Sequence, residues 1–265
     1  MERKLKTVLT ILAVTIIAIL AVFVASMPAN PNGNVAGIKV RGEIVSYVSP
    51  EYSNEEGHLL KDVTSSEEIS AFIERAEKDP GIKAVFIEID SYGGEAFASQ
   101  EAMEAIKYCS KPKIAVVKRA ATSGAYWIAT GADTIVASEI SEVGGIGVKN
   151  SYLEQARQNE NNGLTFIELS SGKFKEIGSP NKPLSEEERS LLMRDIMIIH
   201  EAFVKDVSLN RNIPIERVRE IADGSTMLGE MALENHLIDV LSRNADPTEE
   251  LSRAIEEEPR IEWYN

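Results

Sequence analysis

A chain of 265 residues can bury a sizeable core, and 43% hydrophobic with 26% charged residues is typical of a folded globular protein. The formal net charge of −14 leaves no basic surface for nucleic acid, which argues against that class of partner. With Cys109 as its one cysteine, the chain cannot be a disulfide scaffold. The only activating neighbours of Cys109 are Lys107 and Lys111, so we interpret it as a buried structural thiol.

The N-terminal segment predicts a membrane anchor. Residues Thr7–Met27 carry no charge, and this run matches the ~20 residues that span a bilayer. A cleavable signal peptide has a shorter apolar region of ~7–15 residues and a clearer cleavage site than VASMPAN. The positive-inside rule keeps Arg3, Lys4 and Lys6 cytoplasmic. We therefore expect residues 1–27 to be a cytoplasmic stub with a single-pass signal anchor, and the rest of the chain to be extracytoplasmic.

After a Pro/Asn/Gly linker at 28–34, strand-like and helix-like patterns alternate. We expect strands at VAGIKVRGEIV, KAVFIEID, KIAVVKRA, TIVAS and TFIELSS, and helices at SSEEISAFIERAEKD, GEAFASQEAMEAIKYCS and SGAYWIATGA. The first of these helices begins with a capping box, Ser65 to Glu68. Unbroken apolar strands that are each followed by a helix predict an α/β fold with a parallel sheet covered on both faces.

The second half is predominantly helical in its pattern. A long helix is expected over LSEEERSLLMRDIMIIHEAFVKDVSLNRN, opened by a second capping box, Ser185 to Glu188. A shorter helix follows at PIERVREIADG, with Pro214 in its first turn and Gly224 as its stop. GEMALENHLIDVL predicts a last short helix that runs into a strand, and residues 246–265 form an acidic C-terminal tail.

Functional groups of parallel sheets gather where the strands end, so two strand-to-helix junctions are of interest. At the first, EIDSYGGEAF, the paired Gly93 and Gly94 permit positive φ and close approach of another backbone. Their amides would lie at a helix N-terminus, which suits a developing negative charge. A tight turn without any ligand explains the same two glycines, and both interpretations stay open at this point.

The second junction, KRAATSGAYW, places Ser123 at the first turn of a helix with the Gly124 amide beside it. Ser123 is either a helix cap or a nucleophile whose oxyanion is stabilised by nearby backbone amides. Ala121 and Thr122 precede the serine, so the stretch is not the G-x-S-x-G elbow of α/β-hydrolases.

A serine nucleophile needs a base. None of the three histidines has a neighbourhood that suggests a triad, because His58 lies in a polar loop, His200 in a long amphipathic helix and His236 near a helix end. A lysine with a depressed pKa can serve instead. SSGKFKEIGSP offers Lys173 and Lys175, although a solvated surface charge is the ordinary role of such lysines.

Five stretches, in the correct order and spacing, resemble the signal peptide peptidase A family. They are IEIDSYGGEAFAS, similar to the family's I-x-S-P-G-G; KPKIAVVKRAATSGAYWIATGAD, similar to K-P-V…A-A-S-G-G-Y-Y-I-A…A-D; TIVASEISEVGGIGV; SSGKFKEIGSPNKPLSEEER; and ADGSTMLGEMALENHLID. Members of this family are membrane-anchored serine peptidases with a Ser-Lys dyad and a crotonase/ClpP-like fold. The resemblance therefore implies a ClpP/crotonase-like peptidase domain at residues 35–245.

The resemblance implies a role for several residues. Ser123 matches the nucleophile and Lys175 the general base, whereas Lys173 falls on a variable position. The backbone donors of the oxyanion hole match Gly94, with Gly93 as an alternative, and Gly124. No metal or organic cofactor is implied.

Four departures from the family's pattern leave the loop conformation and the groove width open. Tyr92 stands where the family has proline, and Thr122 where it has alanine. Ala125 and Trp127 replace glycine and tyrosine after the serine. None of these changes removes a catalytic atom.

The resemblance also implies substrates and partners. We expect an endopeptidase that degrades cleaved signal peptides and other short or unfolded apolar polypeptides. Short members of the family assemble as homo-oligomers whose active sites are shared, so Ser123 is expected to meet Lys175 of an adjacent subunit. Two alternatives are a related ClpP-like membrane serine protease specific for a membrane-protein partner and a non-catalytic scaffold with a crotonase-like fold.

Overall fold

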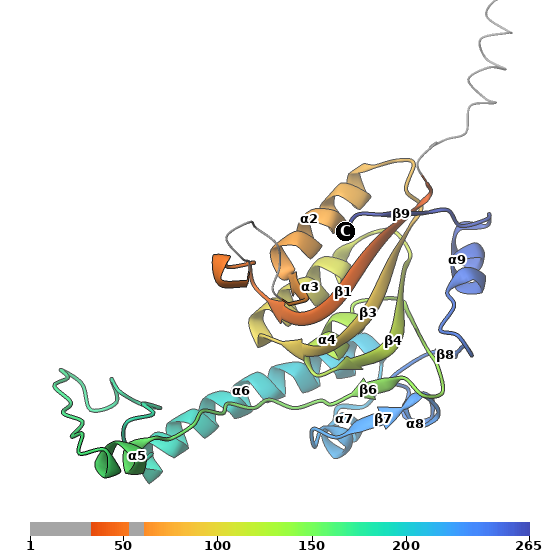
Figure 1. Ribbon diagram of the computed structural model, residues 1–265. Coiled ribbons are helices and arrows are strands. Elements are labelled where there is room, and N and C mark those ends of the chain that lie inside the picture. The colour runs from red at the N-terminus through yellow and green to blue at the C-terminus, as the bar shows by residue number, and fades with distance from the viewer. Residues whose placement is uncertain (1–32, 53–60) are drawn as a thin grey trace, which may run out of the picture.

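The computed structural model describes residues 33–52 and 61–265, so the predicted anchor and most of the predicted linker lie outside the described residues (Figure 1). The strands are β1 (Val35–Val45), β2 (Val63–Ser65), β3 (Ala84–Gly94), β4 (Lys113–Thr122), β5 (Thr134–Ala137), β6 (Glu142–Gly144), β7 (Thr226–Leu228), β8 (Val240–Leu241) and β9 (Ile261–Trp263). The helices are the 3-10 turn η1 (Pro50–Tyr52), α2 (Ser66–Lys78), α3 (Ala96–Tyr108), α4 (Gly124–Ala129), α5 (Ala156–Asn161), α6 (Glu186–Arg211), α7 (Ile215–Ile221), α8 (Gly229–Glu234) and α9 (Thr248–Ile255). Across these two described ranges, no helix has both the length and the apolar character needed to cross a bilayer.

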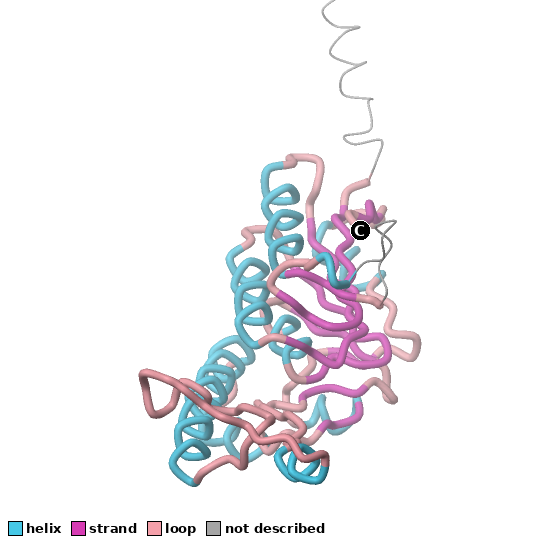
Figure 2. The backbone as a smooth tube through the Cα atoms, turned by 60° about the vertical axis from the view of Figure 1, so that its left-hand side comes forward, coloured by secondary structure: helices cyan, strands magenta, loops and turns pink. Residues whose placement is uncertain are grey.

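The central sheet has the order β2-β1-β3-β4-β5-β8, and all of these neighbours pair in parallel. The prediction of an α/β fold with a parallel sheet is thus confirmed. Helices α2 and α3 lie together on one side of the sheet (Figure 2). On the opposite face, Leu251 of α9 joins a smaller core with residues such as Phe86 and Val116. Both faces are covered, which explains why the strands consist of unbroken apolar runs.

The two predicted capping boxes mark where helices begin. Ser65 is the N-cap of α2, and its side chain accepts a hydrogen bond from Glu68 N. Ser185 is the N-cap of α6; its side chain accepts from Glu188 N, while its own backbone N donates to the Glu188 carboxylate. Both helices therefore begin where the sequence predicted.

Residues 149–184, which we call the arm, run alongside the N-terminal half of α6 and away from the sheet (Figure 1). The C-terminal half of α6 is anchored in the core by Phe203, Val204 and Val207, which are buried. The prediction of a strand at TFIELSS, residues 165–171, is wrong, because this part of the arm contains no strand. A strand needs a neighbouring strand for its backbone groups, and the arm lies beside a helix instead.

The acidic tail folds against the body of the protein. Its helix α9 packs under the sheet, and β9 adds a parallel strand to β1, with Val35 opposite Ile261. The close approach of β9 to β1 requires Gly37, because a Cβ there would lie 2.6 Å from the Trp263 ring. The tail thus contributes a strand that the sequence pattern did not predict.

Candidate active site

Ser123 lies between β4 and α4 in a strained backbone conformation. Its φ of 53° and ψ of −127° lie in a region that residues with a Cβ rarely occupy, at a cost of about 1–3 kcal/mol. Two hydrogen bonds hold it there, from Ser123 N to Gly144 O (2.8 Å) and from Trp127 N to Ser123 O (3.0 Å). The Ser123 side chain makes no capping hydrogen bond, so the helix-cap interpretation is wrong. The turn instead presents a hydroxyl that has no hydrogen-bond partner in the described ranges 33–52 and 61–265.

The two junctions singled out in the sequence meet at Ser123. Strands β3 and β4 are neighbours, so their carboxyl ends lie side by side. A Cβ on Gly93, whose φ is +101°, would lie 3.0 Å from Ser123 Cβ and 2.8 Å from Gly124 N. A Cβ on Gly124 would lie 2.2 Å from Ser99 Oγ and 3.3 Å from Gly94 N. Only glycines allow the backbones to approach this closely.

The backbone amides of Gly94 and Gly124 are oriented for a ligand. Gly124 is the first residue of α4, so its N–H has no partner within the helix. Glu95 N donates to Ile44 O (2.8 Å), and a parallel ladder engages alternate residues of a strand. The N–H of Gly94 therefore points away from β1, towards the side where α4 begins. Two donors beside one hydroxyl form an arrangement that suits acyl transfer.

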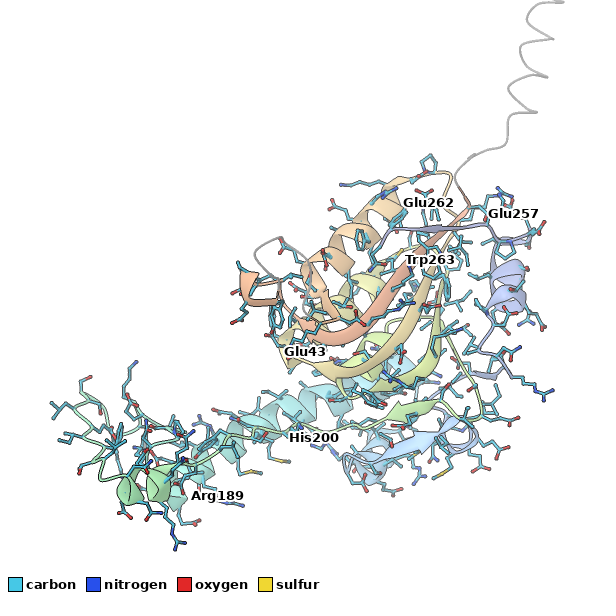
Figure 3. The ribbon with its side chains drawn as sticks, in the orientation of Figure 1. Glu43, Arg189, His200, Glu257, Glu262 and Trp263 are labelled. Carbon is cyan, nitrogen blue, oxygen red and sulfur yellow. The ribbon has the colours of Figure 1, made fainter. Side chains whose placement is uncertain are left out.

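Ser123 opens into a groove of ≈ 900 Å³ between the sheet and α6. Most of the groove walls are apolar, and the larger apolar side chains are Trp127, Val148, Leu192, Ile196, Ile199 and Phe203. The floor is rigid: the Trp127 ring stacks on Phe203 at 4.5 Å, and Trp127 Nε1 donates to Asp206 Oδ2 (3.0 Å). The lining also includes charged residues, among them Glu43 near the end of β1, which is labelled in Figure 3.

The structure does not bring the predicted lysines to Ser123 within one chain. Lys175 is exposed on the arm and is not among the residues that line the groove. Lys173 is also exposed and forms an ion pair with Glu187. Arg189, on the part of α6 next to the arm, shows in Figure 3 how far this end extends from the sheet. Lys149 is the lysine of the groove lining, and sequence reasoning missed it.

The signal that could have identified Lys149 is its position directly after GGIGV. This segment approaches Ser123, because a Cβ on Gly145 would lie 3.2 Å from Ser123 N. The contribution of α6 to the groove was also missed, since the amphipathic pattern of a helix does not reveal which strand end it faces.

The two described histidines, His200 and His236, lie away from Ser123, and His58 lies outside the described residues. His200 Nε2 lies 3.1 Å from Ala222 O, and His236 is exposed with a φ of 59°. Neither lines the groove. Cys109 is buried, and burial together with a hydrogen bond to Glu77 raises the pKa of its thiol to about 11, which agrees with a structural thiol.

Residues 105–256, more than half of the chain, match the sequence pattern of peptidase family S49. This chain belongs to peptidase family S49. A homologue named signal peptide peptidase SppA, from Enterococcus faecium, is 33% identical over 184 residues, which are 68% of this chain and 54% of the homologue. The serine protease SPPA, chloroplastic, of Arabidopsis thaliana is 32% identical over 193 residues, 72% of this chain and 28% of the relative. The S49 chain thus spans about half the length of the first relative and less of the second.

Among solved structures, a mutant of the 1510-N membrane-bound stomatin-specific protease shares the fold of this S49 chain. The TM-score is 0.55 at 16% sequence identity, and the match covers 89% of this chain and 99% of the other. At this identity the likeness concerns the fold alone. The resemblance inferred from the five sequence stretches is confirmed by the S49 membership and by the SppA homologues.

Proposed function

We propose that this chain is a serine endopeptidase with a Ser-Lys dyad and a crotonase/ClpP-like fold. Its substrates are cleaved signal peptides and other short or unfolded apolar polypeptides. The observation that carries the proposal is the strained Ser123, whose hydroxyl is free of partners among the described residues and lies beside three glycine backbones at the floor of an apolar groove. Strain of this kind is retained at functional sites.

The chemistry is acyl transfer. Neutral Lys175 takes the proton of Ser123 Oγ, which forms a bond to the carbonyl carbon of the peptide. The oxyanion accepts hydrogen bonds from the amides of Gly94 and Gly124, with Gly93 shaping the loop. When the C–N bond breaks, Lys175 Nζ gives its proton to the leaving amine, and a water activated by the same lysine then hydrolyses the ester. This sequence of steps needs neither a metal nor an organic cofactor.

Lys175 reaches Ser123 from a neighbouring subunit in this proposal. Two observations support a shared site. Lys175 is exposed on the arm and remote from the groove of its own chain. The arm also exposes many large apolar side chains, which a monomer would leave in water: Tyr152, Leu153, Leu164, Phe166, Ile167, Leu169 and Phe174. A homo-oligomer that buries the arm would bring each lysine to the next serine.

The proposed location is the cell membrane, with one anchor at residues 1–27 and the peptidase on the extracytoplasmic side. The charge-free run Thr7–Met27 and the basic residues before it support this topology. Signal-peptide remnants are apolar and membrane-released, so an anchored enzyme with an apolar groove is placed where its substrates arise.

An active-site-directed fluorophosphonate tests the proposal. The wild-type oligomer should be labelled at Ser123 and should cut apolar signal-peptide sequences at many positions, as read by mass spectrometry. Ser123→Ala should lose both properties, whereas Ser110→Ala, which removes an exposed serine outside the groove, should keep both. A single cut in one membrane protein would instead support the partner-specific protease, and neither labelling nor cleavage would support the scaffold.

A further inference from the structure

Ser91 is a buried serine that precedes the two glycines of the candidate site. Its side chain belongs to a residue that is 1% exposed, and no step of the proposed chemistry uses it. Ser91 Oγ donates a hydrogen bond to Gly42 O on β1 (2.6 Å). The same oxygen accepts a hydrogen bond from Gly93 N (3.1 Å). The hydroxyl thus uses its one donor and one of its acceptor positions on backbone groups of two different strands.

The ladder between β1 and β3 is interrupted where Ser91 lies. Arg41 pairs with Asp90, but the next pair is Glu43 with Gly93, so Gly42 alone faces two residues of β3. A second irregularity occurs on the other side of β3, between Ile89 and Ser91 in the pairing with β4. Such bulges bend a strand and leave backbone groups without their regular partners.

The Ser91 hydroxyl takes the place of a missing ladder bond. Gly42 O and Gly93 N lie on facing strands, and both bond to the same oxygen instead of to each other. Gly42 itself has a φ of +67°, and a Cβ there would collide with Asp62 O at 1.8 Å. The backbone of β1 is therefore fixed at the bulge. Through its hydrogen bonds to Gly42 O and Gly93 N, Ser91 fixes the position of β3 relative to it.

This bridge determines where the Gly94 amide points. Gly93 N–H is directed towards β1 by Ser91, and successive amides of an extended strand point in opposite directions. The Gly94 N–H is thereby turned towards Gly124 and Ser123. Gly93 has no side chain to restrict its own rotation, and its φ of +101° is one of several that a glycine adopts freely. Without the bridge, the peptide groups on either side of Gly93 would be free to rotate.

We propose that Ser91 is a positioning residue that holds the Gly93–Gly94 backbone in the orientation needed to stabilise the oxyanion formed at Ser123. The inference rests on the proposed function, since it assigns Ser91 to the same site. Its effect is exerted through Gly93 and not through contact with the substrate.

The test compares Ser91→Ala with the wild-type oligomer on a signal-peptide substrate. Loss of a whole oxyanion donor lowers kcat by ~10²–10³, so a misaligned donor should lower it by about tenfold or more. KM should change by less than about twofold, because ground-state binding is untouched. Affinity for a peptide boronate, which forms a tetrahedral adduct with Ser123, should fall in parallel with kcat. Substrate affinity measured in the Ser123→Ala background should stay the same.

The matched control is Ser66→Ala, which removes another buried serine hydroxyl. Its partners are Glu101 Oε2 and Ser46 O, and Ser66 does not line the groove. It should leave kcat and boronate affinity unchanged. If Ser91→Ala does not fold, Ser91→Cys keeps a side-chain atom at the same branch point with a somewhat larger and weaker hydrogen-bonding group, and it should give an intermediate loss.

Unchanged kcat and boronate affinity in a folded Ser91 variant would overturn the inference while leaving the proposed function intact. A wild-type oligomer that is neither labelled at Ser123 by the fluorophosphonate nor able to cut peptides would overturn both. The two failures are therefore distinguishable from the same set of samples.

Discussion

The backbone of Ser123 has φ and ψ values close to the mirror image of the polyproline region, which is open to glycine and closed to other residues. The strain is balanced by packing on all sides: Gly124 and Ala125 behind it are fully buried, and Gly144 accepts its N–H. The proposed mechanism requires a hydroxyl at this turn, so glycine could not take the place of Ser123 despite its better fit to the backbone.

The strain at Ser123 can be measured with two inactive variants. Ser123→Ala keeps the Cβ and hence the strain, whereas Ser123→Gly removes it. We expect Ser123→Gly to be more stable than Ser123→Ala by about 1 kcal/mol, since relief of ~1–3 kcal/mol of strain exceeds the ~0.5–1 kcal/mol of added chain entropy. Urea unfolding of both proteins gives the difference. Equal stability, or a less stable glycine variant, would show that the turn is not strained.

Three lysines compete for the role of base, and single substitutions separate them. Lys175→Ala should reduce turnover by at least ~10²-fold with the oligomer intact, because general-base catalysis contributes this much or more. Lys173→Ala should stay active, since Lys173 is engaged with Glu187. Lys149 lines the groove, so Lys149→Ala should alter KM more than kcat. Inactivity of the Lys149 variant together with an active Lys175 variant would move the base to Lys149 and make the site self-contained.

At the scale of elements, the C-terminus of α2 is held by a lysine from the loop before β4. Lys111 Nζ donates to three backbone carbonyls, Ala76 O (2.5 Å), Asp79 O (2.5 Å) and Ile82 O (2.7 Å). Ala76 lies in the last turn of α2, Asp79 is its C-cap and Ile82 lies in the loop that follows, so Lys111 joins the end of the helix to that loop. A cation is also favoured there by the helix dipole.

Replacement of Lys111 should destabilise the fold. Lys111→Met keeps the apolar stem but removes the hydrogen bonds to the three carbonyls. The free energy of unfolding should fall by about 2 kcal/mol, which is typical of hydrogen bonds to a charged group. Lys107→Met, an exposed lysine in the last turn of α3, should change stability by less than ~0.5 kcal/mol. Chemical unfolding of the two variants provides the comparison, and a similar loss in both would argue against the capping role.

A second contact at the end of α2 predicts a pH dependence. Glu77 accepts hydrogen bonds from Ser110 Oγ, Cys109 Sγ and Ser110 N, and these donors lower the pKa of its carboxyl from 4.5 to about 2. A carboxyl whose pKa is lower in the folded state stabilises the protein fully above pH 4.5 and progressively less as the pH falls towards 2. Thermal unfolding of the wild type should therefore show a steeper fall over this range than Glu77→Gln. Parallel curves would contradict this expectation.

Sequence patterns predicted the long strands and helices of the core but missed the three-residue strands β2, β6, β7 and β9, which are too short to show a pattern. The apolar runs of β1, β3 and β4 identified buried parallel strands, and the capping boxes located the starts of α2 and α6. TFIELSS has a similar β-branched and apolar composition, but the pattern does not reveal whether a partner strand exists. Its Phe166, Ile167 and Leu169 remain exposed, because no strand pairs with this segment in the described part of the chain.

The candidate site was predictable in part for a comparable reason. Adjacent parallel strands bring their carboxyl ends together, so Gly93, Gly94 and Ser123 could be expected in one place. The positive φ of Ser123, the bulge at Gly42 and the approach of Gly145 depend on contacts between distant segments. No local sequence signal encodes these contacts.

At the scale of the whole molecule, the proposal that the active site is shared between subunits makes a quantitative prediction. Ser123→Ala and Lys175→Ala proteins should each be inactive as homo-oligomers. After subunit exchange at equal concentrations, a cyclic assembly would contain about a quarter of its sites with an intact serine facing an intact lysine, so about a quarter of wild-type activity should return. A peptidase assay before and after mixing measures this fraction. No recovery despite verified exchange would place both residues of the dyad in the same chain.

The outer side of β1 has a consequence for solubility. Strand β9 pairs with its first residues and β2 with its last. Between them, Asn265 bonds both backbone groups of Lys39, and Thr64 Oγ1 does the same for Arg41. Two side chains thus continue the hydrogen bonding of β9 and β2 across the gap, so among the described residues this side of β1 has no run of unpaired backbone groups. An open edge strand can pair with a second molecule and start aggregation, and the acidic tail covers the first residues of β1 against such pairing.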